Sequence, residues 1–200
     1  KYLVIGNPIK HSLSPKLHNY WIKENKIDAV YNKKQSNETD IEKIIAEIKG
    51  GKIDGINVTV PFKKSVIPFL NELTSVAKKT KSVNTVYKKM DKIIGDNTDV
   101  GGFEGALQRI NYKVQGKKAF VLGAGGVAPS IILVLKKMGA SKIFLSNRTK
   151  EKAKDLQRMH PDLELVDWGD TVKFDMIINA TSLGLKEDDE IKLNYDDIGS

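Results

Sequence analysis

The sequence contains no cysteine, which excludes disulfide bonds, thiolate metal sites and cysteine nucleophiles. It also has no apolar run near the roughly 18 residues that a membrane-spanning helix needs. Its first residues do not follow the charged-then-apolar pattern of a secretory signal. From these absences we expect a cytoplasmic protein that has no membrane partner.

Arginine is scarce in a chain that is otherwise basic. The 33 lysines and arginines outnumber the 25 acidic residues and give a formal net charge of +8, yet only Arg109, Arg148 and Arg158 are arginines. A basic balance can indicate a nucleic-acid partner. Here the lysines form short scattered clusters mixed with acids, without interleaved aromatic residues, which favours a solvated lysine-rich surface. We therefore expect no nucleic-acid partner, and we treat each arginine as informative.

The order of apolar and polar patterns predicts an α/β fold with two α/β domains that meet near residue 100. In the first domain, residues 1–100, the patterns predict strands at 2–6, 29–34 and 53–60, helices at 14–26 and 40–48, short helices up to about residue 79, and a hairpin of 82–89 with 92–96. An amphipathic helix at 99–110 could join the domains. In the second domain, residues 101–200, strands at 118–123, 142–147, 163–166 and 174–180 alternate with helices at 126–138 and 149–158. Such alternation implies parallel sheets, and the second domain is predicted to be Rossmann-like.

The segment KAFVLGAGGVAPS (118–130) combines an apolar strand, a glycine-rich turn and a helix, and its turn fits the pattern GxGxxA. In this pattern Gly123 permits the tight turn, Gly125 lets the backbone approach a pyrophosphate, and Ala128 allows close packing of helix and strand. The helix N-terminus adds amide donors and a partial positive charge. A glycine turn without a ligand is the alternative, but the strand and helix around it favour dinucleotide binding.

The next predicted strand ends in Asn147-Arg148-Thr149, roughly 20 residues further on, where NAD enzymes usually place an acid for the ribose hydroxyls. An acid would repel a 2′-phosphate, whereas an arginine can bind it through two charge-assisted hydrogen bonds. The sequence thus predicts NADP in preference to NAD, with Lys152 as additional charge one helical turn later. The alternative is that Arg148 is an ordinary surface residue near the start of a helix.

Four polar clusters lie where loops leave the ends of the first domain's strands: HSLSP (11–15), NVTVPFK (57–63), VNT (83–85) and DNTD (96–99). Ligands of open α/β sheets bind at such strand ends. The clusters supply neutral hydrogen-bonding groups suited to a polyhydroxylated ligand, namely Ser12, Ser14, Asn57, Thr59, Asn84 and Thr98. Lys63 and Asp99 are the two charged residues that could transfer a proton.

These residues also have purely structural interpretations. Ser14, followed by Pro15, is expected to cap the helix that begins there. Asn57 and Asn84 could only tie turns together, and Asp99 could only cap the helix that follows it. The histidines lie too far apart in the sequence to indicate a metal site, so we expect no metal.

Taken in order, the motifs GNPIKHSLSPKLHN, NVTVPFKK, VNTV, GDNTDVGGF, LGAGGVAPS, SNRT and INATSLG resemble those of the shikimate dehydrogenases, from residue 2 to about residue 185. The resemblance implies an NADP-dependent oxidoreductase that reversibly reduces 3-dehydroshikimate to shikimate, in the pathway to chorismate and the aromatic amino acids. It also implies a small-molecule substrate, an N-terminal substrate-binding and catalytic domain, and a C-terminal NADP-binding domain. Both a monomer and a homodimer are open.

The same resemblance implies roles for individual residues. Ser12 and Ser14 would bind the substrate carboxylate. The substrate hydroxyls would be bound by Asn57, Thr59, Asn84 and Asp99, with Thr98 also in the substrate site. The pyrophosphate would be held by Gly123, Ala124, Gly125, Gly126 and Val127, and the 2′-phosphate by Asn147, Arg148, Thr149 and Lys152, while Thr181 and Ser182 would lie near the cofactor. Lys63 and Asp99 would be the acid–base pair beside the reacting carbonyl. We favour Lys63 as the group that delivers the proton, because a nearby ammonium can also stabilise the charge that hydride transfer leaves on oxygen.

The chain departs from the family pattern at two places. Lys81-Ser82 stands where the family usually has Gly-Ala, so we expect a differently shaped loop before VNT. The family also contributes a late glutamine and glycine to its site, from a segment that would follow Ser200. The final stretch LNYDDIGS contains no closing element, and we expect that the C-terminal end of the second domain is missing; a chain that ended at Ser200 would have an incomplete active site.

Two other functions remain open at this point. A relative that acts on quinate as well as shikimate would use NAD, and Arg148 argues against it. A non-catalytic NADP-sensing module would keep Arg148 and the glycines but would not need Lys63 and Asp99. The presence of both charged residues within matching clusters favours an enzyme.

Overall fold

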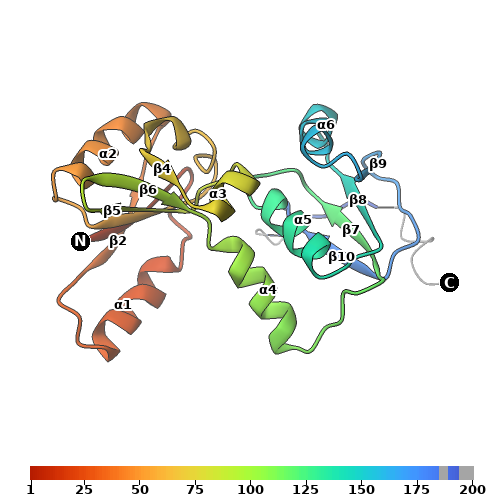
Figure 1. The fold of residues 1–200 in the computed structure, drawn as a ribbon, viewed down its shortest axis with the longest axis horizontal. Helices are drawn as coiled ribbons and strands as arrows, with labels where there is room; N and C mark the ends of the chain where they lie inside the picture. The colour runs from red at the N-terminus through yellow and green to blue at the C-terminus, as the bar shows by residue number, and fades with distance from the viewer. Residues whose placement is uncertain (185–188, 194–200) are drawn as a thin grey trace. The chain divides into compact units, whose positions relative to one another are not determined.

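A computed structural model describes residues 1–184 and 189–193 of the chain. The chain divides into two compact units, Lys1–Thr98 and Asp99–Ser200, each described below by itself (Figure 1). Within the described residues no helix is long and apolar enough to cross a membrane. The predicted absence of a closing element in LNYDDIGS concerns residues that, apart from Leu193, lie outside the described part of the chain.

The first unit, whose residues 1–98 are all described, contains one mixed sheet in the order β2-β1-β3-β5-β6-β4. Its strands are β1 (Tyr2–Gly6), β2 (Tyr31–Gln35), β3 (Gly55–Val58), β4 (Glu72–Leu73), β5 (Thr85–Lys89) and β6 (Lys92–Asp96). β1 is parallel to β2 and β3, while β5 is antiparallel to both β3 and β6. The expectation of a parallel sheet is therefore wrong for this unit. The reason lies in the hairpin, which was itself correctly predicted: only antiparallel strands can be joined by a turn as short as Met90-Asp91.

Helices cover both faces of this sheet, as Figure 1 shows for α1 (Ser14–Glu24) and α2 (Ile41–Lys49). The isoleucines of α2 recur at helical spacing, and Ile41, Ile44 and Ile48 are at most 1% exposed. They pack against β-strand residues such as Ile5 and Val86 in the main core of the unit. The remaining helical elements are η1 (Glu38–Asp40), η2 (Ile67–Phe69) and α3 (Ser75–Thr80).

The start of α1 differs from the prediction. The helix begins at Ser14 itself, its cap position is Leu13, and no side chain caps it. The hydroxyl of Ser12 instead accepts a hydrogen bond from the backbone N–H of Ser14, at 3.3 Å. The interpretation of Ser14 as a helix cap is therefore wrong, because Ser12 satisfies that N-terminal donor and the Ser14 hydroxyl is not committed to capping.

The second unit is a Rossmann-like α/β domain, as predicted. Its elements are α4 (Asp99–Arg109), β7 (Lys118–Leu122), α5 (Ala128–Lys137), β8 (Lys142–Ser146), α6 (Lys150–Met159), β9 (Glu164–Val166) and β10 (Met176–Asn179). The strands described are all parallel, in the order β10-β7-β8-β9. Strand order therefore reverses at β7, and the crevice beyond the carboxyl end of that strand is where such sheets bind ligands.

Candidate functional site

All four polar clusters of the first unit reach one edge of its sheet. β1 and β3 are parallel, so the loops that follow them leave from the same edge. β5 runs the opposite way and begins at that edge, and β6 ends there. Backbone hydrogen bonds join three of the clusters: Val58 donates to Asn84 (2.8 Å), and Asn84 to Asp96 (3.0 Å). In the loop after β1, which leads to the fourth cluster, Asn7 donates to Val60 (2.9 Å). The topology thus brings together residues separated by more than 80 positions in the sequence.

Three of the candidate substrate-binding residues share one hydrogen-bonded network. The amide nitrogen of Asn57 donates to the backbone oxygen of Asn84 (3.2 Å) and to the hydroxyl of Thr85 (3.1 Å). Asn84 Nδ2 donates to the Thr98 hydroxyl, and the Thr98 N–H donates back to Asn84 Oδ1, both at 2.9 Å. Asn57 and Asn84 therefore tie these loops together, which was their structural interpretation. The network also holds polar atoms in fixed places at the sheet edge.

Thr59 and the Ser12–Ser14 turn belong to the loops after β3 and β1. A side chain at Gly6 would lie 2.5 Å from Thr59 Cγ2 and 3.1 Å from the carbonyl oxygen of Val60, so a glycine is required where these loops meet. Ser12, Ser14 and Thr59 are all partly buried. The loops after β1 and β3 therefore meet closely at Gly6, and each carries candidate hydroxyl groups.

Lys63 lies in the loop after β3, and Asp99 follows the last residue of the first unit. Lys63 is partly buried, and its backbone oxygen accepts the N–H of Val83 at 2.8 Å, which fixes it beside the VNT cluster. Asp99 is the first residue of α4 and follows Thr98 directly. A carboxylate in the first turn also favours the helix electrostatically, so its structural interpretation stands beside the functional one. The two residues belong to different units, and their pairing stays a prediction.

The glycine-rich turn of the second unit has a backbone that only glycine fits at its first position. Gly123 has φ +103°, and a Cβ there would lie 2.8 Å from the backbone C and O of Ala180. At Gly125 a Cβ would meet only the Ala180 oxygen, at 3.9 Å, so the turn is open on this side. Ala128 is fully buried where α5 begins. The turn therefore fits a pyrophosphate approaching Gly125 at the N-terminus of α5.

Asn147 connects this turn to the loop after β8. Its Oδ1 accepts the backbone N–H of Ala124 (2.9 Å), and its Nδ2 donates to the backbone oxygen of Thr149 (2.7 Å). One side-chain amide thus braces the candidate pyrophosphate and 2′-phosphate loops against each other. Arg148 and Lys152 are exposed, and neither makes an ion pair with a carboxylate among the described residues. Both cations are therefore placed to meet an incoming phosphate.

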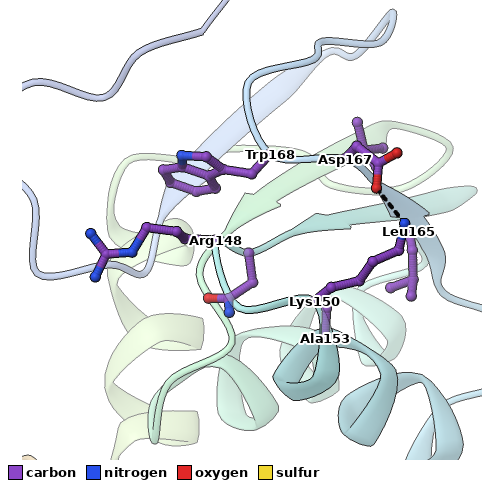
Figure 2. A pocket seen from close by; sticks show the side chains of 8 residues that line it. Arg148, Lys150, Ala153, Leu165, Asp167 and Trp168 are labelled. Atoms are coloured by element: carbon purple, nitrogen blue, oxygen red, sulfur yellow. Dashed lines mark hydrogen bonds and ion pairs between the residues drawn. The ribbon is translucent and has the colours of Figure 1, made fainter.

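Figure 2 shows a pocket beside Arg148, between the loops that follow β8 and β9. Trp168 faces the pocket from the loop after β9, on the same side as Arg148. On the other side Lys150 donates a hydrogen bond to Asp167 at 2.7 Å. This hydrogen bond, together with the charge of Asp167, raises the pKa of Lys150. The pocket thus presents an aromatic ring and two cations beside the loop in which the 2′-phosphate site is predicted.

The loop after β10 approaches the glycine turn from the other side. Thr181 donates from its N–H and its hydroxyl to Asn179 Oδ1, at 2.9 and 2.7 Å, and its own hydroxyl oxygen accepts the Leu183 N–H at 3.0 Å. A Cβ at Gly123 would lie 2.9 Å from Thr181 Cγ2, so Thr181 adjoins the turn. Ser182 is the next residue of this loop. Thr181 therefore lies beside the candidate cofactor site.

Sequence reasoning missed two residues that the structure brings to these sites. Trp168 is one of two tryptophans in the chain, and its position two residues after the end of a strand of a parallel sheet was an available signal. Tyr31 donates a hydrogen bond from its hydroxyl to Asn57 Oδ1 at 2.6 Å, and no local pattern reports a contact across 26 positions. Among residues 1–184 and 189–193, no three His, Asp or Glu side chains lie close enough to hold a metal ion.

Comparison with known proteins also divides the chain into a substrate-binding part and a dehydrogenase part. A family model described as the shikimate dehydrogenase substrate binding domain matches residues 4–86, and one described as shikimate / quinate 5-dehydrogenase matches residues 104–184. Over 197 residues the chain is 58% identical to the shikimate dehydrogenase (NADP(+)) of Pelagibacter ubique, covering 98% of this chain and 74% of that protein.

Solved structures agree. The crystal structure of shikimate dehydrogenase from Aquifex aeolicus matches with a TM-score of 0.88 at 43% identity, covering 98% of this chain and 73% of that one. The Thermus thermophilus enzyme in complex with NADP(H) and shikimate matches with a TM-score of 0.82 at 28% identity, covering 92% and 69%. The chain therefore spans about three quarters of the length of its relatives. With both units matched and more than half of the aligned residues identical to one member, the chain belongs to the shikimate dehydrogenase family.

Proposed function

We propose that this protein reversibly reduces 3-dehydroshikimate to shikimate with NADPH, in the pathway to chorismate and the aromatic amino acids. The observation that carries the proposal is the edge of the first sheet, where a network of neutral amides and hydroxyls lies beside a lysine loop. Neutral donors and acceptors suit a ligand with several hydroxyl groups. Similarity to the Thermus thermophilus enzyme, solved with NADP(H) and shikimate, supports the same ligands here.

The substrate-binding roles follow from the chemistry of the side chains. Ser12 and Ser14 lie together in the turn before α1 and supply hydroxyl donors for the substrate carboxylate. Asn57, Asn84 and Thr98 are linked by hydrogen bonds and present fixed polar atoms to the substrate hydroxyls. Thr59 adds a further hydroxyl from the loop after β3.

The cofactor is held by the second unit. The turn from Gly123 to Val127 receives the pyrophosphate, and Arg148 with Lys152 binds the 2′-phosphate. Thr149 closes the same loop, and Thr181 with Ser182 lies on the opposite side of the turn. When bound, NADPH supplies the hydride for the ketone carbon of the substrate.

Lys63 delivers the proton to the substrate oxygen. Charge develops on that oxygen as the carbonyl is reduced, and an ammonium group nearby both stabilises the charge and provides the proton. Asp99 orients Lys63, since a carboxylate attracts an ammonium group beside it. In the direction of shikimate oxidation the same lysine accepts the proton from the hydroxyl.

Substitution of Lys63 tests this proposal. In the full-length protein, Lys63→Ala should lower kcat for shikimate oxidation by at least ~100-fold, the scale of lost general acid–base catalysis. The matched control is Lys64→Ala, which removes the exposed neighbouring lysine and should leave kcat unchanged. Turnover is followed by nicotinamide absorbance with shikimate and NADP+, and NADP+ binding is measured separately. Near-normal turnover of Lys63→Ala would contradict the assignment.

The wild-type protein itself decides between an enzyme and the sensing module. An absorbance change with shikimate and NADP+ shows catalysis. Binding of NADP+ without any absorbance change in the full-length protein would instead support a non-catalytic NADP-sensing module and would overturn the proposed function.

A further inference from the structure

We propose that Tyr31 is a positioning residue of the substrate site, and that its hydroxyl fixes the side-chain amide of Asn57 so that Asn57 can only accept hydrogen bonds from the substrate. The inference rests on the proposed function, because it concerns the same site. Tyr31 belongs to β2, which is polar in sequence and carries none of the site's motifs.

Tyr31 is held rigidly from several directions. Asn19 clamps its backbone: Asn19 Nδ2 donates to the Tyr31 oxygen at 2.7 Å, and the Tyr31 N–H donates to Asn19 Oδ1 at 2.9 Å. The ring of His18 stacks on the Tyr31 ring with centroids 4.2 Å apart and an interplanar angle of 5°. Tyr31 is only 3% exposed and packs with Val4 and Ile9. Its hydroxyl therefore has a fixed position before any ligand binds.

The hydroxyl of Tyr31 remains a donor over the whole working range of an enzyme. Burial raises the pKa of Tyr31 well above its ordinary value, so the phenol keeps its proton. The hydroxyl donates to Asn57 Oδ1 at 2.6 Å, a short distance for a hydrogen bond of this kind. It thereby anchors the oxygen side of the Asn57 amide.

The other side of the amide is fixed as well. The Asn57 nitrogen faces the backbone carbonyl of Asn84 and the hydroxyl of Thr85, at 3.2 and 3.1 Å. A carbonyl oxygen can only accept, so the amide nitrogen must lie on that side and the oxygen must face Tyr31. Both amide hydrogens are then used within the protein. What Asn57 still offers is the second lone pair of Oδ1, which accepts a hydrogen bond from a substrate hydroxyl.

Loss of the Tyr31 hydroxyl should therefore make the position of Asn57 Oδ1 less fixed, while the Tyr31 ring still fills its place in the core. Tyr31→Phe keeps the ring that stacks on His18 and leaves Asn57 anchored on its nitrogen side alone. One neutral hydrogen bond that orders a substrate contact corresponds to roughly a tenfold effect. We expect kcat/KM for shikimate to fall about tenfold, while KM for NADP+ changes by less than about twofold.

The matched control is Tyr87→Phe. Tyr87 lines the same small pocket on the sheet as Tyr31 and Asn57 and is partly buried. Among the described residues its hydroxyl makes no hydrogen bond, unlike that of Tyr31. Its substitution should leave both kinetic constants unchanged. Melting temperatures of both variants show whether a change in kinetics accompanies a loss of folding.

A double-mutant cycle distinguishes positioning from a general structural role. If Tyr31 acts through Asn57, then Tyr31→Phe combined with Asn57→Ala should be no worse than Asn57→Ala alone. In addition, the preference for shikimate over analogues that lack one ring hydroxyl should shrink in Tyr31→Phe for the hydroxyl that Asn57 contacts. Additive effects in the cycle, or kcat/KM for shikimate within twofold of wild type in Tyr31→Phe, would overturn the inference. Absence of shikimate oxidation by the wild-type protein would remove the proposed function and this inference together, whereas an active wild type with an unaffected Tyr31→Phe removes the inference alone.

Discussion

Gly123 and Gly125, the first two glycines of the candidate cofactor turn, should respond in opposite ways to the same substitution. Gly123 has φ +103°, a region that side chains rarely adopt, and a Cβ there would lie 2.8 Å from the backbone C and O of Ala180. The strained backbone costs on the order of 1–3 kcal/mol. The contact with a backbone that cannot rotate away adds overpacking of similar size, about 1–3 kcal/mol. Gly123→Ala should therefore destabilise the protein by about 2–6 kcal/mol.

Gly125→Ala meets no such obstacle. Its φ is not in the left-handed region, and a Cβ would lie 3.9 Å from the Ala180 oxygen, an ordinary contact. An alanine that the backbone tolerates usually stabilises by about 0.4–1 kcal/mol, because it restricts the unfolded chain. Its methyl group, however, would occupy the open side from which the pyrophosphate approaches. Loss of backbone hydrogen bonds to a charged group, about 1.5–3 kcal/mol, should weaken NADP+ binding by tenfold to a hundredfold.

Thermal unfolding and NADP+ titration of the two variants measure both effects. For a chain of this size a loss of about 3 kcal/mol lowers the melting temperature by about 6–12 °C. We expect this fall for Gly123→Ala, and an unchanged or slightly raised value for Gly125→Ala together with weakened binding. Wild-type NADP+ affinity in Gly125→Ala would refute the pyrophosphate assignment. A wild-type melting temperature for Gly123→Ala would refute the packing argument.

Two further substitutions test the cofactor preference and the unusual loop before VNT. Arg148→Ala should lower kcat/KM for NADPH by about 10- to 100-fold and leave that for NADH nearly unchanged, because only NADPH carries the 2′-phosphate; equal losses with both cofactors would contradict the role of Arg148. Lys81→Gly should raise the melting temperature by a few degrees, since Lys81 adopts the left-handed conformation (φ 47°, ψ 40°). Relief of about 1–2 kcal/mol exceeds the entropic cost of glycine, about 0.5–1 kcal/mol, whereas Lys79→Gly within α3 should lower the melting temperature. A lower melting temperature for Lys81→Gly would show that its side chain contributes contacts that outweigh the strain.

The departure from the family pattern at Lys81-Ser82 shows that a motif comparison does not report the packing around a loop. A lysine in place of the family's glycine predicted a differently shaped loop, and this stays a prediction. Lys81 itself adopts a left-handed backbone, which glycine populates without strain. The next residue, Ser82, is fully buried, and its backbone oxygen accepts a hydrogen bond from Asn97 at 2.9 Å. Packing around Ser82 therefore specifies the backbone at this point more strongly than the intrinsic preference of Lys81 does.

The second unit was the more predictable of the two. β7 and β8 are nearly continuous apolar runs that are buried along almost their whole length, and such runs stand out from polar flanks. In the first unit β2 reads YNKKQ and buries only Tyr31, and β4 is two residues long. Edge strands like these have little apolar alternation, so β4 was not predicted from the sequence. For the same reason the sequence did not indicate a role for Tyr31 in the substrate site. What the sequence could not supply were hydrogen bonds between residues far apart in the chain.

Those long-range hydrogen bonds also show that a structural role and a ligand-binding role are compatible in one asparagine. Asn57 ties three strands together, and Asn147 braces two backbone loops of the other unit. A side-chain amide carries a donor and an acceptor in one rigid plane, so a single asparagine can join two segments and still keep a lone pair for a ligand. A site that must bind hydroxyls or phosphates in fixed directions needs such groups held before the ligand arrives, because ordering them during binding would cost affinity. An asparagine directly at the carboxyl end of a strand, as in NVT and NRT here, can therefore tie loops together and contact a ligand for the same physical reason.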